Sequence, residues 1–241
     1  MKNRQSIPFY LLSISVFLFL VSPHVLSDGM FMDGLLYAAI SNNLSNGYGT
    51  FWNLFLSDTL YPSFHEHPPL AFGIQSLFFD LFGESRFVER GYSISCFIIS
   101  GYIITKIWIK INPKNYHKLA WLPLLFWFIT PLVSWSASNN MLENTMMIFT
   151  SLSILFFISA INENKAIYFV LMGFVLSLGF LTKGFVSLFP LSILLWYHLF
   201  YPPFSYQKLF FNSFLSLFGL IFPFLVLFIF FPESYISLEA Y

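Results

Sequence analysis

Charged residues are scarce in this sequence, and cysteine is almost absent. Only 9% of the 241 residues are Asp, Glu, Lys or Arg, whereas soluble domains contain about 25%. The single cysteine, Cys96, excludes an internal disulfide and a paired-cysteine metal site. The formal net charge is zero and no basic run occurs, so the sequence gives no indication of nucleic-acid binding.

Long apolar stretches, by contrast, are abundant. Hydrophobic residues make up 57% of the chain, and 34 of them are Phe. The stretch 209–231 carries no charge and is longer than the roughly 20 residues needed to cross a hydrocarbon core. We therefore predict an all-α, polytopic membrane protein with about seven transmembrane helices. The predicted spans are 8–26, 88–109, 119–137, 141–161, 166–182, 184–200 and 209–231.

The segment 27–87, between the first two predicted spans, has mixed character. Leu36, Ile40 and Leu44 recur at helical spacing and predict a helix over 33–46, which an Asn-Gly-Tyr-Gly sequence ends. Pro68 suits the first turn of a second helix over 68–82, and Gly83 follows its end. This second helix is shorter than the roughly 17 residues of even a short span.

The distribution of Lys and Arg decides whether the 68–82 helix crosses the membrane. If it lies on the surface and the N-terminus is cytoplasmic, eight basic residues fall inside and three outside. If it crosses, the numbers become five and six. We therefore expect both helices to be juxtamembrane helices on the extracytoplasmic face. The eight inside are Lys2, Arg4, Lys106, Lys110, Lys114, Lys118, Lys165 and Lys208, and the three outside are Arg86, Arg90 and Lys183.

Two carboxylates begin predicted helices on the outer side. Asp33 either stabilises the helix dipole or acts as a catalytic base that deprotonates an acceptor hydroxyl. Glu143 can likewise be a dipole effect, but an acid at membrane depth is costly without a partner. We take both as candidate catalytic residues.

A cluster of His65, Glu66 and His67 stands directly before Pro68. A carboxylate and imidazoles are ligands for a divalent cation, and such an ion would stabilise a departing phosphate as a Lewis acid. Neighbouring residues of an extended segment point to opposite sides, so one ion does not take all three. We expect Glu66, and after it His65, as metal ligands; the alternative is a polar loop at the interface.

Two cations at span ends have two interpretations each. Lys183 and Arg90 either extend to the membrane interface, as long basic side chains do, or bind a lipid phosphate.

Four motifs occur in the order found in membrane glycosyltransferases of the GT-C architecture. The chain resembles the dolichyl-phosphate-mannose protein mannosyltransferase and aminoarabinose lipid A transferase superfamily over nearly its whole length. The motifs are Asp33-Gly34-Leu35-Leu36-Tyr37-Ala38; Glu66-His67-Pro68-Pro69-Leu70; Phe82-Gly83-Glu84-Ser85-Arg86-Phe87 with Arg90; and Asn140-Met141-Leu142-Glu143-Asn144-Thr145, followed later by Thr182-Lys183-Gly184.

The resemblance implies a hexosyl- or pentosyltransferase that takes a sugar from a polyprenyl-phosphate-linked donor. Its acceptor would be a lipid, glycan or protein, and its site would face outward from the bacterial inner membrane. The resemblance places the catalytic aspartate on Asp33 and a metal-ligand glutamate on Glu66. Relatives of the lipid A type have Lys, which contacts the donor phosphate, where this chain has His67. Their second acid, commonly Asp, is Glu143 here.

We expect four residues to contact the lipid phosphate or the donor: Tyr37, His67, Arg90 and Lys183. Enzymes of this type are usually much longer, so residues 1–241, a single GT-C-like domain, are expected to be the N-terminal portion of a longer enzyme or a truncated product. The alternatives are a transporter or flippase of a lipid-linked saccharide, which internal repeats and mid-bilayer polar residues would favour, and a non-catalytic membrane subunit.

Overall fold

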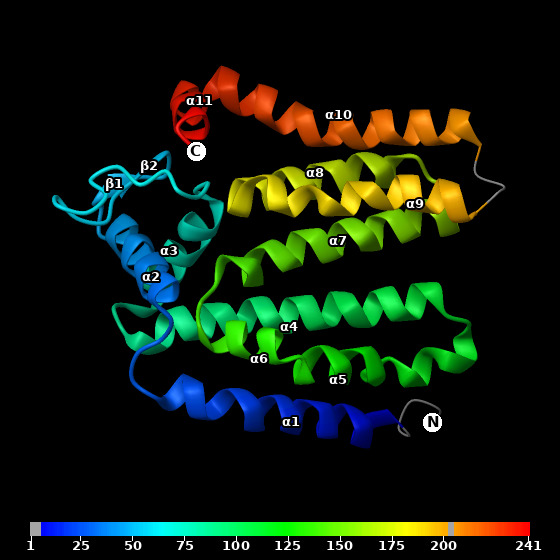
Figure 1. The fold of residues 1–241 in the computed structure, drawn as a ribbon, viewed down its shortest axis with the longest axis horizontal. Helices are drawn as coiled ribbons and strands as arrows, with labels where there is room; N and C mark the ends of the chain where they lie inside the picture. Colours follow the sequence, from blue (N-terminus) through cyan, green and yellow to red (C-terminus); the bar gives the residue numbers. More distant parts are fainter. Residues whose placement is uncertain (1–5, 202–204) are drawn as a thin grey trace.

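The computed structural model of the protein describes residues 6–201 and 205–241. Lys2 and Arg4, two of the eight basic residues expected on the inner side, lie outside the described residues. Most of its helices run along one common direction and form a flat, layered bundle (Figure 1). The helices are α1 (Ile7–Leu26), α2 (Met32–Ser45), α3 (Leu70–Phe82), α4 (Arg86–Ile111), η2 (Lys114–Leu119), α5 (Trp121–Ile129), α6 (Pro131–Ser138), α7 (Leu142–Glu163), α8 (Ile167–Lys183), η3 (Gly184–Leu191), α9 (Ser192–Phe200), α10 (Tyr206–Phe230) and α11 (Pro232–Glu239).

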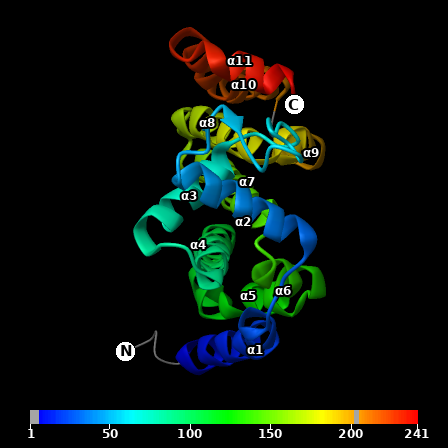
Figure 2. The same cartoon turned by 90° about the vertical axis from the view of Figure 1, so that its left-hand side faces the viewer.

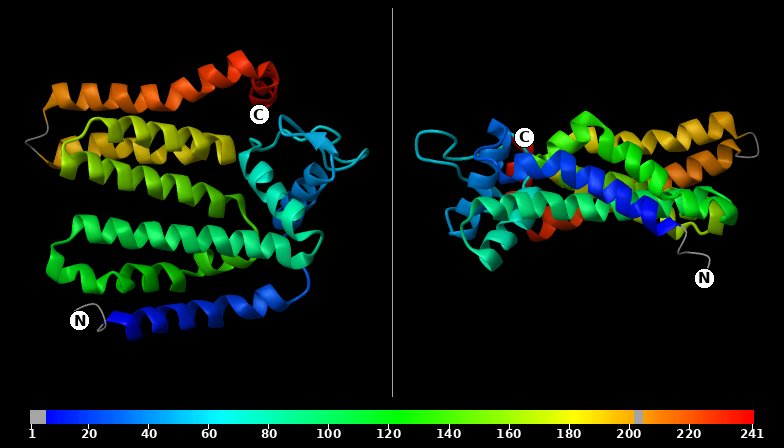
Figure 3. Two further views of the ribbon diagram at one scale, coloured as in Figure 1. Left: turned by 180° about the vertical axis from the view of Figure 1, so that it is seen from behind. Right: turned by 90° about the horizontal axis from the view of Figure 1, so that it is seen from below.

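The layers of the bundle follow the order of the chain, except that α5 and α6 lie between α1 and α4 (Figure 1). Helix α1 packs against α5 and α6, α4 packs against α7, α7 against α8, and α8 against α10. Figures 1 and 3 show α1 and α10 at the two opposite edges of the bundle. The predicted all-α, multi-pass membrane architecture is therefore confirmed.

The number of crossings agrees only partly with the prediction of seven. Within the described residues, five helical stretches are long and apolar enough to cross a membrane, or six if one bent pair counts as a span. Four of these stretches, α1, α4, α7 and α10, match predicted spans to within three residues at each end. The fifth is the 34-residue stretch Ile167–Phe200.

That fifth stretch reverses direction at Gly184. The ring of Phe157 lies 6.3 Å from the ring of Phe169 and 5.4 Å from the ring of Tyr197, so both halves of the stretch pack on the same side of α7. Gly184 has φ of 64°, a conformation that glycine adopts without strain. Figure 1 shows α8 and α9 side by side. The chain therefore folds back at the boundary predicted between 166–182 and 184–200, while the total of seven stays a prediction.

The span predicted over 119–137 is bent and not continuous. The helical segment Lys114–Ile129 meets α6 at an angle of 74°. Pro131 is the cause, because its ring disfavours helical geometry at the preceding residue, and Thr130 accordingly has an extended ψ of 119°. The two pieces form a broken span or a re-entrant loop.

The two predicted juxtamembrane helices are present as α2 and α3, which pack together across one end of the bundle (Figure 2). Helix α3 has 13 residues and is therefore about 20 Å long, too short for a 30 Å core. Gly83 follows its end, as predicted, with φ of 75°. A small hairpin of β1 (Gly49–Thr50) and β2 (Asn53–Leu54), which no sequence pattern predicted, covers α2.

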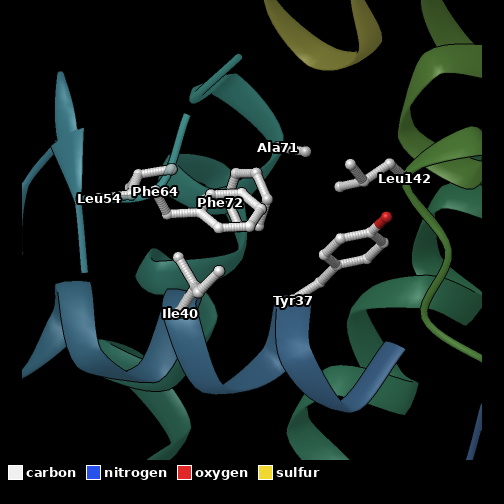
Figure 4. Close-up of a cluster of buried hydrophobic side chains, with 7 residues drawn as sticks. All are labelled: Tyr37, Ile40, Leu54, Phe64, Ala71, Phe72 and Leu142. Atoms are coloured by element: carbon white, nitrogen blue, oxygen red, sulfur yellow. The ribbon is translucent and has the colours of Figure 1, made fainter. Parts of the chain in front are cut away.

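A buried apolar cluster holds α2, α3 and the hairpin to the start of α7 (Figure 4). Ile40 and Phe72 are completely buried there. The oxygen of Tyr37 lies at the edge of the cluster, on the side of Leu142 (Figure 4). The cluster consists of Tyr37, Ile40, Leu54, Phe64, Ala71, Phe72 and Leu142. It fixes the position of the polar groups that surround Tyr37.

Candidate active site

Two residues from separate motifs meet at the centre of the polar end of the bundle. The hydroxyl oxygen of Tyr37, on α2, lies 3.0 Å from Nε2 of His67, on the loop before α3. Their rings meet edge to face at 5.6 Å. The apolar cluster positions Tyr37, and Pro68 and Pro69 fix the backbone just after His67. The Tyr37–His67 pair is therefore held rigidly from both sides.

Three carboxylates act electrostatically on Tyr37. Burial raises the pKa of its hydroxyl, and the negative charges of Asp33, Glu143 and Glu66 raise it further. These acids come from the first turn of α2, the first turn of α7 and the loop before α3. The structure thus brings together groups from three sequence motifs. At neutral pH the raised pKa keeps Tyr37 protonated, so its hydroxyl is a hydrogen-bond donor.

His67 has the opposite shift. Burial lowers the pKa of its imidazole and Lys183 lowers it further, while Glu66, Glu143 and Asp33 act in the other direction. The net lowering favours a neutral ring at pH 7. Its second nitrogen, Nδ1, is buried and has no hydrogen-bond partner among the described residues. A buried polar atom without a partner is costly, so Nδ1 of His67 is a candidate contact for a ligand atom.

Lys183 and Glu143 form an ion pair between Nζ and Oε1. The side chain of Lys183 is 18% exposed and that of Glu143 is 46% exposed, so the pair lies at the boundary of the protein interior. The second carboxylate oxygen, Oε2 of Glu143, is buried and has no hydrogen-bond partner in residues 6–201 and 205–241. The pair joins the end of α8 to the start of α7, and it explains how an acid is tolerated at this depth.

An apolar groove of about 530 Å³ lies beside Lys183. The hydroxyl of Tyr241 donates a hydrogen bond of 3.4 Å to the backbone oxygen of Lys183, which places the groove next to the ion pair. The groove is lined by Phe180, Phe185, Phe224, Phe228, Leu238 and Tyr241. The site therefore combines the Lys183–Glu143 ion pair with an adjoining apolar groove.

A buried amide network connects the elements that carry the acids. Nε2 of Gln75 donates to Oδ1 of Asn140 at 2.9 Å, and Ser41 Oγ donates to Oε1 of Gln75 at 3.0 Å. Asn140 Nδ2 also donates to the carbonyl of Gly34 at 3.2 Å. No sequence motif includes Gln75. The one feature that could have drawn attention to it is that it is an amide within the apolar helix predicted over 68–82.

The close approach of α2 to the turn before α7 requires glycine at position 34. A β-carbon there would overlap the backbone oxygen of Asn139. The side chain of Asn139 accepts a hydrogen bond from the backbone N–H of Phe31 at 2.7 Å. The start of α2 is thus fixed to this turn by both Asn139 and Asn140.

Arg90 is not brought to this cluster. Its side chain is only 2% exposed and donates to the carbonyls of Val25, Ser27 (2.8 Å) and Gly29 (2.7 Å). These carbonyls belong to the end of α1 and the linker to α2. Neither of the interpretations offered for Arg90, a donor phosphate contact or an interfacial side chain, describes this arrangement; its guanidinium fixes the path of the linker.

The expected metal ligands, Glu66 and His65, do not form a complete coordination site. In the described part of the chain, no three His, Cys, Asp or Glu side chains are close enough to hold one ion. Nε2 of His65 lies 2.9 Å from Oγ of Ser63, and exposed Glu66 interacts with Tyr61, raising the pKa of that tyrosine. The protein groups alone therefore do not fit a metal site, although Mg²⁺ can be held by one or two carboxylates together with substrate phosphate.

Sequence comparison agrees with this architecture. The dolichyl-phosphate-mannose-protein mannosyltransferase family matches residues 66–235, which is more than half of the chain. The chain belongs to this family. The matched region of this membrane glycosyltransferase family contains Glu66, His67, Glu143 and Lys183, whereas Asp33 and Tyr37 precede it.

One curated relative is an undecaprenyl phosphate-alpha-4-amino-4-deoxy-L-arabinose arabinosyl transferase 1 from Proteus mirabilis (strain HI4320). It is 28% identical to this chain over 160 residues, which cover 64% of this chain and 28% of the relative. The chain thus spans less than a third of the length of that relative. No solved structure matches the chain.

Proposed function

We propose that this chain forms the donor-binding and catalytic part of a glycosyltransferase. The enzyme moves a sugar from a polyprenyl-phosphate-linked donor to an extracytoplasmic lipid, glycan or protein. One observation carries the proposal: Asp33, Glu66, Glu143 and Lys183 all act on the Tyr37–His67 pair. Perturbed and convergent titratable groups of this kind are typical of functional sites. Membership of the family supports the same assignment.

The donor phosphate binds between Lys183 and His67. An ammonium group has three N–H donors, and among the described residues Glu143 is the one side chain that forms an ion pair with it. When Nε2 of His67 accepts a hydrogen bond from the Tyr37 hydroxyl, Nδ1 carries a hydrogen that has no acceptor in the described part of the chain. Both groups therefore have donors available for phosphate oxygens.

The polyprenyl chain of the donor occupies the aromatic groove beside Lys183. The groove is lined by Phe, Leu and Tyr side chains, which suit an isoprenoid chain. Because Tyr241 of the groove bonds the backbone of Lys183, a lipid there brings its terminal phosphate to the ion pair.

Asp33 is the base in the transfer step. It is half-buried at the start of α2 and its charge acts on both Tyr37 and His67. The acceptor hydroxyl gives its proton to Asp33 while its oxygen bonds the anomeric carbon. The bond from that carbon to the phosphate oxygen breaks, and the polyprenyl phosphate departs with the electron pair. Attack opposite the leaving group inverts the anomeric centre.

Glu143 and Tyr37 have supporting roles in this step. The Glu143 carboxylate holds Lys183 at the phosphate, and its unpaired Oε2 is available to a sugar hydroxyl. The protonated Tyr37 hydroxyl sets the tautomer of His67. A divalent cation bound by Glu66 together with donor phosphate would assist the leaving group as a Lewis acid.

The polar cluster at one end of the bundle favours a transferase over a transporter. Transporters bind substrate near the bilayer midplane, whereas Glu143 begins α7 and Lys183 ends α8. We place this end on the extracytoplasmic face of a bacterial inner membrane. The excess of Lys at the opposite end, including Lys110, Lys114 and Lys118, supports that orientation.

Binding of undecaprenyl phosphate to the purified chain in detergent tests the proposal without knowledge of the sugar. We expect undecaprenyl phosphate to bind at least about tenfold more tightly than undecaprenol, because charge-assisted hydrogen bonds contribute about 1.5–3 kcal/mol. Lys183→Gln should remove this difference, and the matched variant Lys114→Gln, at the other end, should keep it. Equal binding of the phosphate and the alcohol would overturn the proposal.

A further inference from the structure

A cavity separate from the apolar groove lies at the end of the bundle opposite the candidate active site. It has a volume of about 440 Å³ and lies between the turn from α7 to α8, the end of α9 and the beginning of α10. Its lining includes Lys165, Lys208 and Asn212 together with Tyr197 and Tyr201. Neither the sequence motifs nor the proposed transfer reaction uses any of these residues.

The cavity carries excess positive charge. Lys165 Nζ lies 3.1 Å from Oε2 of Glu163, and Lys110 Nζ lies 2.9 Å from Oε1 of the same carboxylate. The hydroxyl of Tyr168 donates to Glu163 as well, at 2.9 Å. One carboxylate is thus shared by two ammonium groups. Lys208 has no ion-pair partner in residues 6–201 and 205–241, so the region has three cations and one anion.

The other walls of the cavity are apolar or amphipathic. Phe169 and Phe211 line it, and Phe211 is 57% exposed, at the outer surface of α10. Tyr201, also half exposed, lies just past the end of α9. Tyrosines at the ends of spans commonly lie at the level of lipid headgroups. The cavity therefore has a cationic part at the helix ends and an apolar part along the helix sides.

We propose that this cavity binds an anionic phospholipid. Its phosphate lies against Lys165 and Lys208, and one acyl chain runs along Phe169 and Phe211. Basic pockets between transmembrane helices are suited to anionic headgroups, and the membrane supplies this ligand continuously. Asn212, which is buried and lines the same cavity, is in reach of the headgroup as a further polar contact.

The site is distinct from the proposed donor site. Lys165 precedes α8 and Lys183 ends it. A helix of 17 residues is about 25 Å long, so one lipid phosphate cannot contact both lysines. The inference therefore does not rest on the transferase proposal, and either can fail alone.

Thermal unfolding of the detergent-solubilised chain tests the inference. We expect phosphatidylglycerol to raise the Tm by roughly 5–10 °C at about a hundredfold excess over its Kd, and phosphatidylcholine to raise it much less. The variant Lys165→Gln with Lys208→Gln should lose most of the difference between the lipids. The matched control, Lys114→Gln with Lys118→Gln, removes the same charge from exposed positions of η2 and should keep that difference.

Lys208→Gln alone provides a second test if the double variant is unstable. Lys208 is exposed, so its loss should leave the fold intact and still reduce the phosphatidylglycerol effect. Three results would overturn the proposal: an unchanged effect in Lys208→Gln and the double variant, an equal loss in the control, or an equal Tm rise with water-soluble sn-glycerol 3-phosphate. The last would assign the cavity to a soluble phosphate.

Discussion

The side-chain nitrogen of Asn140 donates a hydrogen bond to the backbone oxygen of Gly34, although the two residues lie 106 positions apart in the sequence. Gly34 directly follows Asp33, and Asn140 lies three residues before Glu143. This contact therefore links the two candidate catalytic carboxylates through short, rigid pieces of backbone. It also makes the geometry of the site sensitive to residues that touch no substrate.

Replacement of Asn140 should lower stability through two separable effects. Asn140 has φ of 51°, which Ala adopts poorly and Gly adopts freely. Asn140→Gly removes only the side-chain hydrogen bonds and should cost about 1–3 kcal/mol, because Gln75 loses a buried partner. Asn140→Ala should cost more. Thermal unfolding in detergent measures both, and a native Tm for Asn140→Gly would show that the network contributes no stability.

Asp33→Asn should abolish most transfer while leaving the fold unchanged. The substitution preserves volume, and a positioned base typically contributes about a hundredfold to ten-thousandfold in rate. The loss should appear in turnover, with undecaprenyl phosphate binding retained. The assay requires membranes that contain the active enzyme and its donor. Near-normal turnover would mean that Asp33 only stabilises the α2 dipole. The matched control is Asp80→Asn, on the exposed surface of α3.

Lys183 and Glu143 should behave as a coupled pair. Lys183→Gln leaves the Glu143 carboxylate without its cation, and Glu143→Gln leaves the ammonium without its anion. The double substitution should therefore be less destabilising than the two single changes added together, by about 1 kcal/mol for a partly exposed pair. A double-mutant cycle of unfolding free energies measures this coupling. Additive losses would mean that the ion pair contributes nothing to the fold.

Binding of a metal ion should require the bound donor, since the described region of the chain offers no complete set of ligands. We expect chelation to stop transfer and added divalent metal to restore it. Glu66→Gln should raise the metal concentration needed for half-maximal transfer. His65→Ala should have a smaller effect, because His65 is held by Ser63. Transfer that resists chelation would leave Glu66 as part of an interfacial loop.

Labelling of introduced cysteines should place the two ends of the bundle on opposite membrane faces. In a Cys96→Ala background, a cysteine at Ser57, in the loop over α2, should react with an impermeant reagent in intact cells. A cysteine at Asn115, in η2, should react only after the membrane is opened. Labelling of the Asn115 position from outside would contradict both the orientation and the surface placement of α3.

The sequence predicted the membrane architecture well because long apolar runs and helix-ending glycines act locally. Gly83 follows the end of α3 as predicted, and α8 ends at Lys183, one residue beyond the predicted span 166–182. The break at Pro131 was also encoded locally, but the apolar composition of 119–137 concealed it. An apolar composition indicates only that a helix lies in an apolar environment. A bend depends on a single proline, which lacks a backbone N–H group and clashes with the residue before it.

The motifs indicated residues that lie together in the structure, but they did not indicate the contacts between those residues. Asp33, Tyr37, His67, Glu143 and Lys183 were singled out by motif order, and the structure brings them together. The sequence did not predict which cation pairs with Glu143. The partners of a polar side chain depend on how distant segments pack, and no local period encodes that packing.

Arg90 contacts carbonyl groups that precede it by 61 to 65 positions. During synthesis, the linker between α1 and α2 therefore emerges long before the guanidinium that fixes it. We therefore expect the linker to reach its final path only after α4 has brought Arg90 to those carbonyls. We expect misplacement of α4 to leave the linker, and the start of α2 that carries Asp33, without this anchor.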